Sequence, residues 1–113
     1  VVILDPSLIS IVNVTSGLKE GGQIIINTKR SLETISSEFD NKWRLAVVDA
    51  TSIAKEILGV NIVNTTMLGA LIKMTGIVKL ESVHEPLKER FGRLAEQNIN
   101  SMTKAYEEIR IKE

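Results

Sequence analysis

Three early runs of apolar residues are typical of buried strands. They occupy residues 1–4, 23–28 and 43–48 and are rich in Val, Ile and Leu. Continuous runs of this kind indicate a parallel sheet that is covered on both faces. Segments with helical spacing of their apolar residues separate the runs, with Ile9, Val12 and Leu18 in the first and Leu32, Ile35 and Phe39 in the second. Strands that alternate with helices predict parallel βαβ units with right-handed crossovers.

Turn residues support the boundaries of these segments. Asp49 and Thr51 follow the third run, and both residue types cap helices, so we expect a helix to begin there and to end at Gly59. Its buried face consists of Ile53, Ala54, Ile57 and Leu58. Gly21 and Gly22 lie between a helix and a strand, whereas glycines that cradle phosphate follow a strand and open a helix. These glycines therefore favour a simple turn.

The segment from residue 67 to residue 78 has apolar residues on every side. Its apolar positions are Met67, Leu68, Ala70, Leu71, Ile72, Met74, Ile77 and Val78. A helix of this kind is buried in a large core or against a partner, and this one is too short for a bilayer, which needs about 20 residues. The small residues Gly69, Ala70 and Gly76 allow another backbone to come close. Two interpretations stay open, a central core helix and a subunit interface.

Beyond residue 78 no further β-branched run occurs, and two helical stripes follow. The first uses Val83, Leu87, Phe91 and Leu94, and the second uses Ala95, Ile99, Met102, Tyr106 and Ile109. Ser82 and Glu85 resemble a capping box, which places Pro86 in the first turn of a helix, where proline is tolerated. The whole pattern predicts a Rossmann-like, doubly wound α/β fold with a mostly parallel sheet and C-terminal helices, in a single domain of residues 1–113.

Composition narrows the range of functions. The chain has 113 residues, 43% of them hydrophobic, which is enough for one domain with a core. Its 14 basic and 14 acidic residues balance, so we expect no nucleic-acid partner. The absence of cysteine excludes disulfides, thiolate zinc sites and cysteine-held iron–sulfur clusters within the chain. Because no targeting signal and no apolar stretch of membrane-spanning length occurs, we expect a cytoplasmic protein without a membrane partner.

Few residues are candidates for chemistry. His84 is the single histidine and has no nucleophile or second metal ligand at a suitable spacing. Asp5 and Asp49 follow predicted strands, at the edge where open α/β sheets bind ligands, but helix capping also explains each of them. The residues Glu85, Lys88, Glu89 and Arg90 are typical of a solvated helix face. We therefore predict no catalytic residue and no metal ligand.

Several segments, taken in order, resemble one protein family. They are Leu-Asp-Pro-Ser-Leu at residues 4–8, the Gly-Leu-Lys-Glu-Gly-Gly turn and following strand at 17–28, Val-Asp-Ala-Thr-Ser-Ile-Ala at 48–54, Asn-Thr-Thr-Met-Leu-Gly-Ala at 64–70, and the stretches 87–91 and 98–106. The chain resembles the gamma subunit of pyruvate:ferredoxin oxidoreductase and of the related 2-oxoacid:ferredoxin oxidoreductases. It departs from the family at Ala105, where a glycine is usual before the tyrosine.

The resemblance implies a function for the complex rather than for this chain alone. Enzymes of this family oxidatively decarboxylate a 2-oxoacid on thiamine diphosphate, pass electrons through iron–sulfur clusters to ferredoxin, and release acyl-coenzyme A. In split forms the thiamine site and the clusters lie on other subunits. The implied partners are the alpha, beta and delta subunits, with ferredoxin reached through the complex. This chain alone is expected to bind no cofactor, and its role is expected to be architectural and near the coenzyme region.

One part of the family pattern is absent. Family members carry an earlier half with a Gly-x-Gly-Gly-Gln-Gly loop, and Gly21-Gly22-Gln23 is not its equivalent because it occupies a helix-to-strand turn. The chain also opens directly on the apolar residues 1–4 without an initiator methionine. We therefore expect this chain to be the later part of a gamma subunit and an incomplete domain. The resemblance assigns no cofactor-binding residue to it.

The segment that opens the apolar helix is the predicted contact with other subunits. The residues expected at or near the face packed on the catalytic subunits are Asn64, Thr65, Met67, Gly69 and Ala70. A bulky replacement of Gly69 is expected to weaken assembly. Two alternatives remain: a stand-alone nucleotide or small-ligand binding α/β module without catalysis, using Asp5 and Asp49, and a self-associating structural domain.

Overall fold

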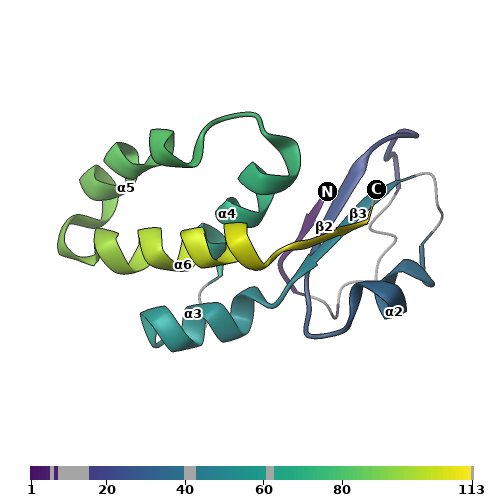
Figure 1. The fold of residues 1–113 in the computed structure, drawn as a ribbon, viewed down its shortest axis with the longest axis horizontal. Helices are drawn as coiled ribbons and strands as arrows, with labels where there is room; N and C mark the ends of the chain where they lie inside the picture. Colours follow the sequence, from purple (N-terminus) through teal and green to yellow (C-terminus); the bar gives the residue numbers. More distant parts are fainter. Residues whose placement is uncertain (6, 8–15, 40–42, 61–62, 113) are drawn as a thin grey trace.

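A computed structural model describes residues 1–5, 7, 16–39, 43–60 and 63–112. At its centre is a four-stranded sheet with the order β1-β2-β3-β4 (Figure 1). Strands β1 (Val2–Ile3), β2 (Gln23–Asn27) and β3 (Arg44–Val48) are parallel, with Val2 opposite Ile25 and Ile25 opposite Ala46. The three predicted strands and the mostly parallel α/β sheet are confirmed.

The fourth strand was not expected from the sequence. Strand β4 (Arg110–Lys112) pairs antiparallel with β3, with Ile111 opposite Ala46. It has only three residues, two of them charged and exposed, so it lacks the β-branched run used to recognise the others. Short, charged strands are typical of sheet edges because they discourage pairing with other chains.

Helices cover both faces of the sheet. One face is covered by α2 (Leu32–Ser36), whose Ile35 is buried against Ile24 and Leu45. The other face, with Ile25 and Ala46, packs against α3 (Ala50–Leu58), α4 (Asn64–Thr75) and α6 (Ala95–Glu108). Helix α5 (His84–Phe91) instead packs through Leu87 against Met102 of α6, and the short 3₁₀ helices η1 (Leu80–Val83) and η2 (Gly92–Leu94) lie on either side of α5 in the chain. The predicted helix around Ile9 and Val12 lies outside the described residues.

Helix α4 packs inside its own chain, against both the sheet and α6. Met67 and Ala70 contact the sheet-side core, and Ile72 contacts Met102 of α6. A Cβ atom on Gly69 would lie 1.9 Å from the carbonyl oxygen of Met102, so the two helix backbones touch at this point. Thr66 donates a hydrogen bond to Ser101 across the same contact, at 3.1 Å. The core-helix interpretation therefore describes the inner face of α4.

The carboxyl end of α4 differs from the prediction. The helix ends at Thr75, and Gly76 adopts a left-handed conformation with φ of 63°. Ile77 and Val78, expected to be part of the apolar helix, lie beyond it and are 76% and 46% exposed. The extension to residue 78 was wrong because a glycine with positive φ ends a helix whatever the hydrophobicity of the residues after it.

Two details of the following helices also correct the sequence interpretation. The capping box does not form, because Ser82 lies within η1 and the residue preceding α5, Val83, makes no side-chain cap. Pro86 nevertheless occupies the first turn of α5, as predicted. The apolar stripe then breaks at Gly92, so Leu94 lies in η2 and is 51% exposed.

An alanine at Gly69 tests the backbone contact between α4 and α6. We expect Gly69→Ala to lower the free energy of unfolding by about 1–3 kcal/mol, because the new methyl group overpacks against a carbonyl oxygen that cannot rotate away. This loss outweighs the gain of about 1 kcal/mol in helix propensity. Denaturant unfolding of the purified protein measures it, with the exposed Glu107→Ala as the control, expected to change stability by less than about 0.5 kcal/mol. A stabilised Gly69→Ala variant would contradict the contact.

Candidate functional site

Asn27 joins the carboxyl ends of the parallel strands. Its side chain is 3% exposed and donates to the carbonyl oxygen of Leu4 at 2.9 Å and to Thr51 Oγ1 at 2.8 Å. Its Oδ1 accepts the backbone N–H of Thr51 at 3.2 Å. One buried amide therefore ties the end of β1 to the first turn of α3. Sequence reasoning missed this role, because an asparagine at the end of a strand is equally typical of a turn.

The two candidate carboxylates are occupied by local hydrogen bonds. Asp49 is the N-cap of α3 and accepts from the backbone N–H and the hydroxyl of Ser52, at 3.1 and 2.8 Å. Asp5 accepts from the hydroxyl and the backbone N–H of Ser7, at 2.8 and 3.0 Å, and these bonds lower the pKa of Asp5 below its ordinary value. The capping interpretation of Asp49 is confirmed, and Asp5 lies in a turn.

A small cavity of about 270 Å³ lies at this edge of the sheet. It opens where the chain leaves β2 toward α2 and leaves β3 toward α3, which cover opposite faces, the position at which open α/β sheets bind ligands. Its charged side chains have both signs, and one of them, Arg30, is paired with Glu38. The lining residues are Thr28, Lys29, Arg30, Ser31, Leu32, Glu33, Val47, Val48, Asp49, Glu108 and Arg110.

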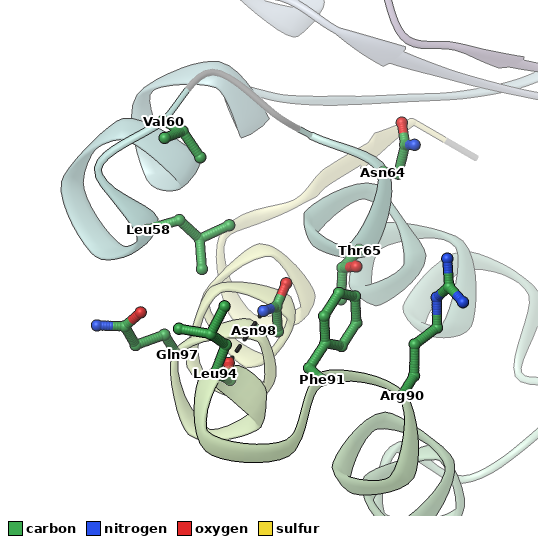
Figure 2. A pocket seen from close by; sticks show the side chains of 9 residues that line it. All are labelled: Leu58, Val60, Asn64, Thr65, Arg90, Phe91, Leu94, Gln97 and Asn98. Carbon is green, nitrogen blue, oxygen red and sulfur yellow. Dashed lines mark hydrogen bonds between the residues drawn. The ribbon is translucent and has the colours of Figure 1, made fainter.

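A larger cavity of about 470 Å³ opens beside the amino end of α4, and we call it the amino-end groove (Figure 2). Its wall comes from the end of α3, the start of α4, the end of α5, η2 and the start of α6. The nine residues that line it are Leu58, Val60, Asn64, Thr65, Arg90, Phe91, Leu94, Gln97 and Asn98. Val60 and Leu94 at its rim are 48% and 51% exposed. Exposed apolar side chains gathered around a cavity mark an interaction site.

The structure divides the five predicted interface residues into two groups. Met67, Gly69 and Ala70 are buried within this chain, with Met67 2% exposed and Ala70 fully covered. Asn64 is exposed and Thr65 is half-buried, and both line the amino-end groove. The part of the segment that another molecule can reach is therefore its first turn. Sequence reasoning missed the rest of the groove, because its residues come from four elements that only the fold brings together.

Other candidate chemistry is sparse in the part of the chain that the structure describes. His84 begins α5, and its buried Nε2 atom has no hydrogen-bond partner there. No group of three or more His, Asp or Glu side chains that could hold a metal ion occurs among these residues. None of the described helices is long and apolar enough to cross a membrane.

Comparison with known protein families identifies the family of the chain. The family model described as pyruvate ferredoxin/flavodoxin oxidoreductase matches residues 1–108. The chain belongs to this family. The resemblance seen in the sequence is therefore confirmed.

Individual members of the pyruvate ferredoxin/flavodoxin oxidoreductase family are similar along nearly the whole chain. The "Pyruvate/ketoisovalerate oxidoreductases common subunit gamma" of Thermococcus litoralis is 51% identical over 95% of this chain and 59% of the relative. The "Pyruvate synthase subunit PorC" of Methanocaldococcus jannaschii is 40% identical over 96% of this chain and 58% of the relative. The chain thus spans about three fifths of the length of these relatives.

A solved structure in the same family supports the fold. The pyruvate oxidoreductase subunit PORC from Thermotoga maritima is 33% identical and superimposes with a TM-score of 0.86, covering 99% of this chain and 64% of that one. The α/β arrangement described above therefore corresponds to about two thirds of a known subunit fold.

Replacing Asn27 by leucine tests the buried amide. Asn27→Leu keeps a similar volume but leaves the Leu4 carbonyl and the Thr51 backbone N–H without their partner, so we expect a loss of about 1–3 kcal/mol in the free energy of unfolding. Asn100→Leu, at an exposed position of α6, is the control and is expected to change little. Equal stability of the two variants would show that the strand ends do not depend on Asn27.

The cap of α3 is tested by a pair of substitutions. Asp49→Ala is expected to cost about 1 kcal/mol, whereas Asp49→Asn, which keeps a capping oxygen, is expected to retain most of the stability. Thermal unfolding of both variants at neutral pH measures the difference. If Asp49→Asn loses as much as Asp49→Ala, the carboxylate charge matters and the capping interpretation is incomplete.

Proposed function

We propose that this chain is part of the gamma component of a pyruvate (2-oxoacid):ferredoxin oxidoreductase. Such a complex oxidatively decarboxylates a 2-oxoacid to acyl-coenzyme A and transfers the electrons to ferredoxin. The observation that carries the proposal is the family match over residues 1–108, together with relatives named as gamma and PorC subunits. A cytoplasmic location belongs to this proposal, because ferredoxin and acyl-coenzyme A are used inside the cell.

The contribution of the chain in this proposal is architectural and near the coenzyme region. Thiamine diphosphate, the iron–sulfur clusters and coenzyme A are bound elsewhere in the complex, on the alpha, beta and delta subunits or between subunits. Two observations support this division: the chain has no cysteine for a cluster, and its two candidate carboxylates already accept hydrogen bonds from their own turns. The chain is not expected to be active alone.

The contact with the catalytic subunits is proposed at the amino end of α4. Asn64 and Thr65 are the accessible residues of the predicted interface segment, and the apolar rim of the amino-end groove lies beside them. Met67, Gly69 and Ala70 support this surface from within, because their packing against the rest of the chain fixes the position of the first turn of α4.

A second function remains, a small-ligand binding module without catalysis. It is favoured by the cavity of about 270 Å³ at the carboxyl edge of the sheet, where Thr28, Lys29 and Arg110 offer hydroxyl and cationic groups. The acidic residues that line the same cavity make it less suited to an anion, so we rank this function second.

Purification from the native source tests the proposed function. A tag on the full-length subunit that contains this chain is expected to recover thiamine-binding and iron–sulfur subunits. The recovered complex is expected to reduce ferredoxin in a coenzyme A-dependent reaction with pyruvate, 2-oxoglutarate or a branched 2-oxoacid. Recovery of the subunit alone, without such activity but with stoichiometric nucleotide binding in calorimetry, would replace the first function by the second.

A further inference from the structure

We propose that the amino-end groove receives a segment of a partner subunit in which an acidic side chain stands next to an apolar one. The inference rests on the proposed function, because it names the occupant of the surface assigned there to subunit contact. It is carried by three features of the groove: its apolar rim, its single positive charge, and an amide oxygen to which no described residue donates.

The apolar rim favours a protein segment over a small molecule. Leu58 and Phe91 line the groove, while Val60 and Leu94 are about half exposed at its edge. A small molecule held inside the cavity would leave these edge side chains in water. A segment of another subunit covers the cavity and the edge together, as the core and rim of an interface do.

The only charge among the described residues that line the groove is positive. Arg90 is the only charged residue among the nine that line it, and within the described part of the chain its guanidinium forms no ion pair. The guanidinium carbon lies 5.9 Å from the centre of the Phe91 ring. Figure 2 shows Arg90 and Asn64 near one end of the groove, with Leu58, Leu94 and Gln97 near the other. An acidic group is therefore expected at the Arg90 end and an apolar group at the Leu94 end.

The first turn of α4 adds to the positive charge of the groove. Its N-cap is Val63, which offers no side-chain acceptor, and no side chain among the described residues caps the first backbone N–H groups of this twelve-residue helix. The amino end of a helix carries a partial positive charge that favours a carboxylate. Asn64 and Thr65 place this end at the wall of the groove, whose lining also includes Arg90.

An amide oxygen on the wall of the groove is available as an acceptor. Asn98 is 8% exposed and donates from Nδ2 to the carbonyl oxygen of Leu94 at 3.0 Å. Its own Oδ1 has no donor among the described residues, although the side chain lines the groove. This oxygen is not among the buried polar atoms without a partner, so water can reach it in the free chain. A bound segment that displaces this water can donate a backbone N–H in its place. The three features together describe a peptide backbone with a carboxylate on one side and an apolar side chain on the other.

Charge reversal in the full-length subunit, assembled with its purified partner subunits, tests the proposal. Arg90→Glu is expected to raise the dissociation constant at least about tenfold, because the cation is replaced by a charge that repels the acidic group. Arg93→Glu is the matched control, since Arg93 is exposed nearby and does not line the groove. It is expected to change the constant less than about twofold. Unchanged thermal stability of both variants excludes misfolding as the cause.

Crosslinking identifies the occupant. The sequence contains no cysteine, so a cysteine introduced into it is the only thiol there that reacts with a photoreactive maleimide. Leu94→Cys places the label at the rim of the groove, and Ile77→Cys places it beyond the other end of α4. The label at position 94 is expected to capture a partner-subunit peptide with an acidic residue beside an apolar one, and the label at position 77 is not. Reversal of that acidic residue to lysine is expected to restore binding of Arg90→Glu.

The outcomes separate this inference from the proposed function. If the wild-type subunit does not assemble with the catalytic subunits, the proposed function fails. If it assembles and is active, but Arg90→Glu binds as tightly as Arg93→Glu, only the groove proposal is overturned. Capture of a second copy of the subunit at position 94, or of a segment without an acidic residue, also overturns it.

Discussion

The structure depends on the close contact between α4 and α6. At Gly69 the two backbones touch, because a single Cβ atom there would lie 1.9 Å from the carbonyl oxygen of Met102. This approach lets Met67 and Ala70 reach the sheet while Ile72 packs on the other side against Leu87 and Met102. A helix that is apolar all round needs neighbours on all sides, and here the sheet, α5 and α6 supply most of them.

The position of α4 in turn creates the surface that other molecules can reach. Arg44 of β3 donates to the carbonyl oxygen of Met74 at 2.6 Å, so the carboxyl end of α4 is tied to the sheet. Its amino end has no side-chain cap in the part of the chain that the structure describes, and it meets α5, η2 and α6 at the amino-end groove. One end of the helix thus serves the stability of the chain, and the other end remains available for a partner. This arrangement agrees with the architectural role that we propose for the chain.

The sequence predicted the regular parts of this fold, because their signals are local. The apolar runs marked β2 and β3, Asp49 and Gly59 marked the ends of α3, and the ordered family segments led to the family. What it missed depends on contacts between distant residues. Strand β4 is recognised only by its pairing with β3, and Asn27 only by its bonds to Leu4 and Thr51. The groove joins residues of five elements, so no single stretch of sequence displays it.

Hydrogen exchange of the full-length subunit, measured free and in the assembled complex, tests the central claim most directly. The backbone amides of α4 from residue 69 to residue 75 are expected to be protected already in the free subunit, because this chain buries them itself. Residues 58–60 and 90–98, around the amino-end groove, are expected to gain protection only on assembly. If α4 exchanges freely in the isolated subunit and becomes protected only in the complex, the helix is buried by the partners and the account is wrong.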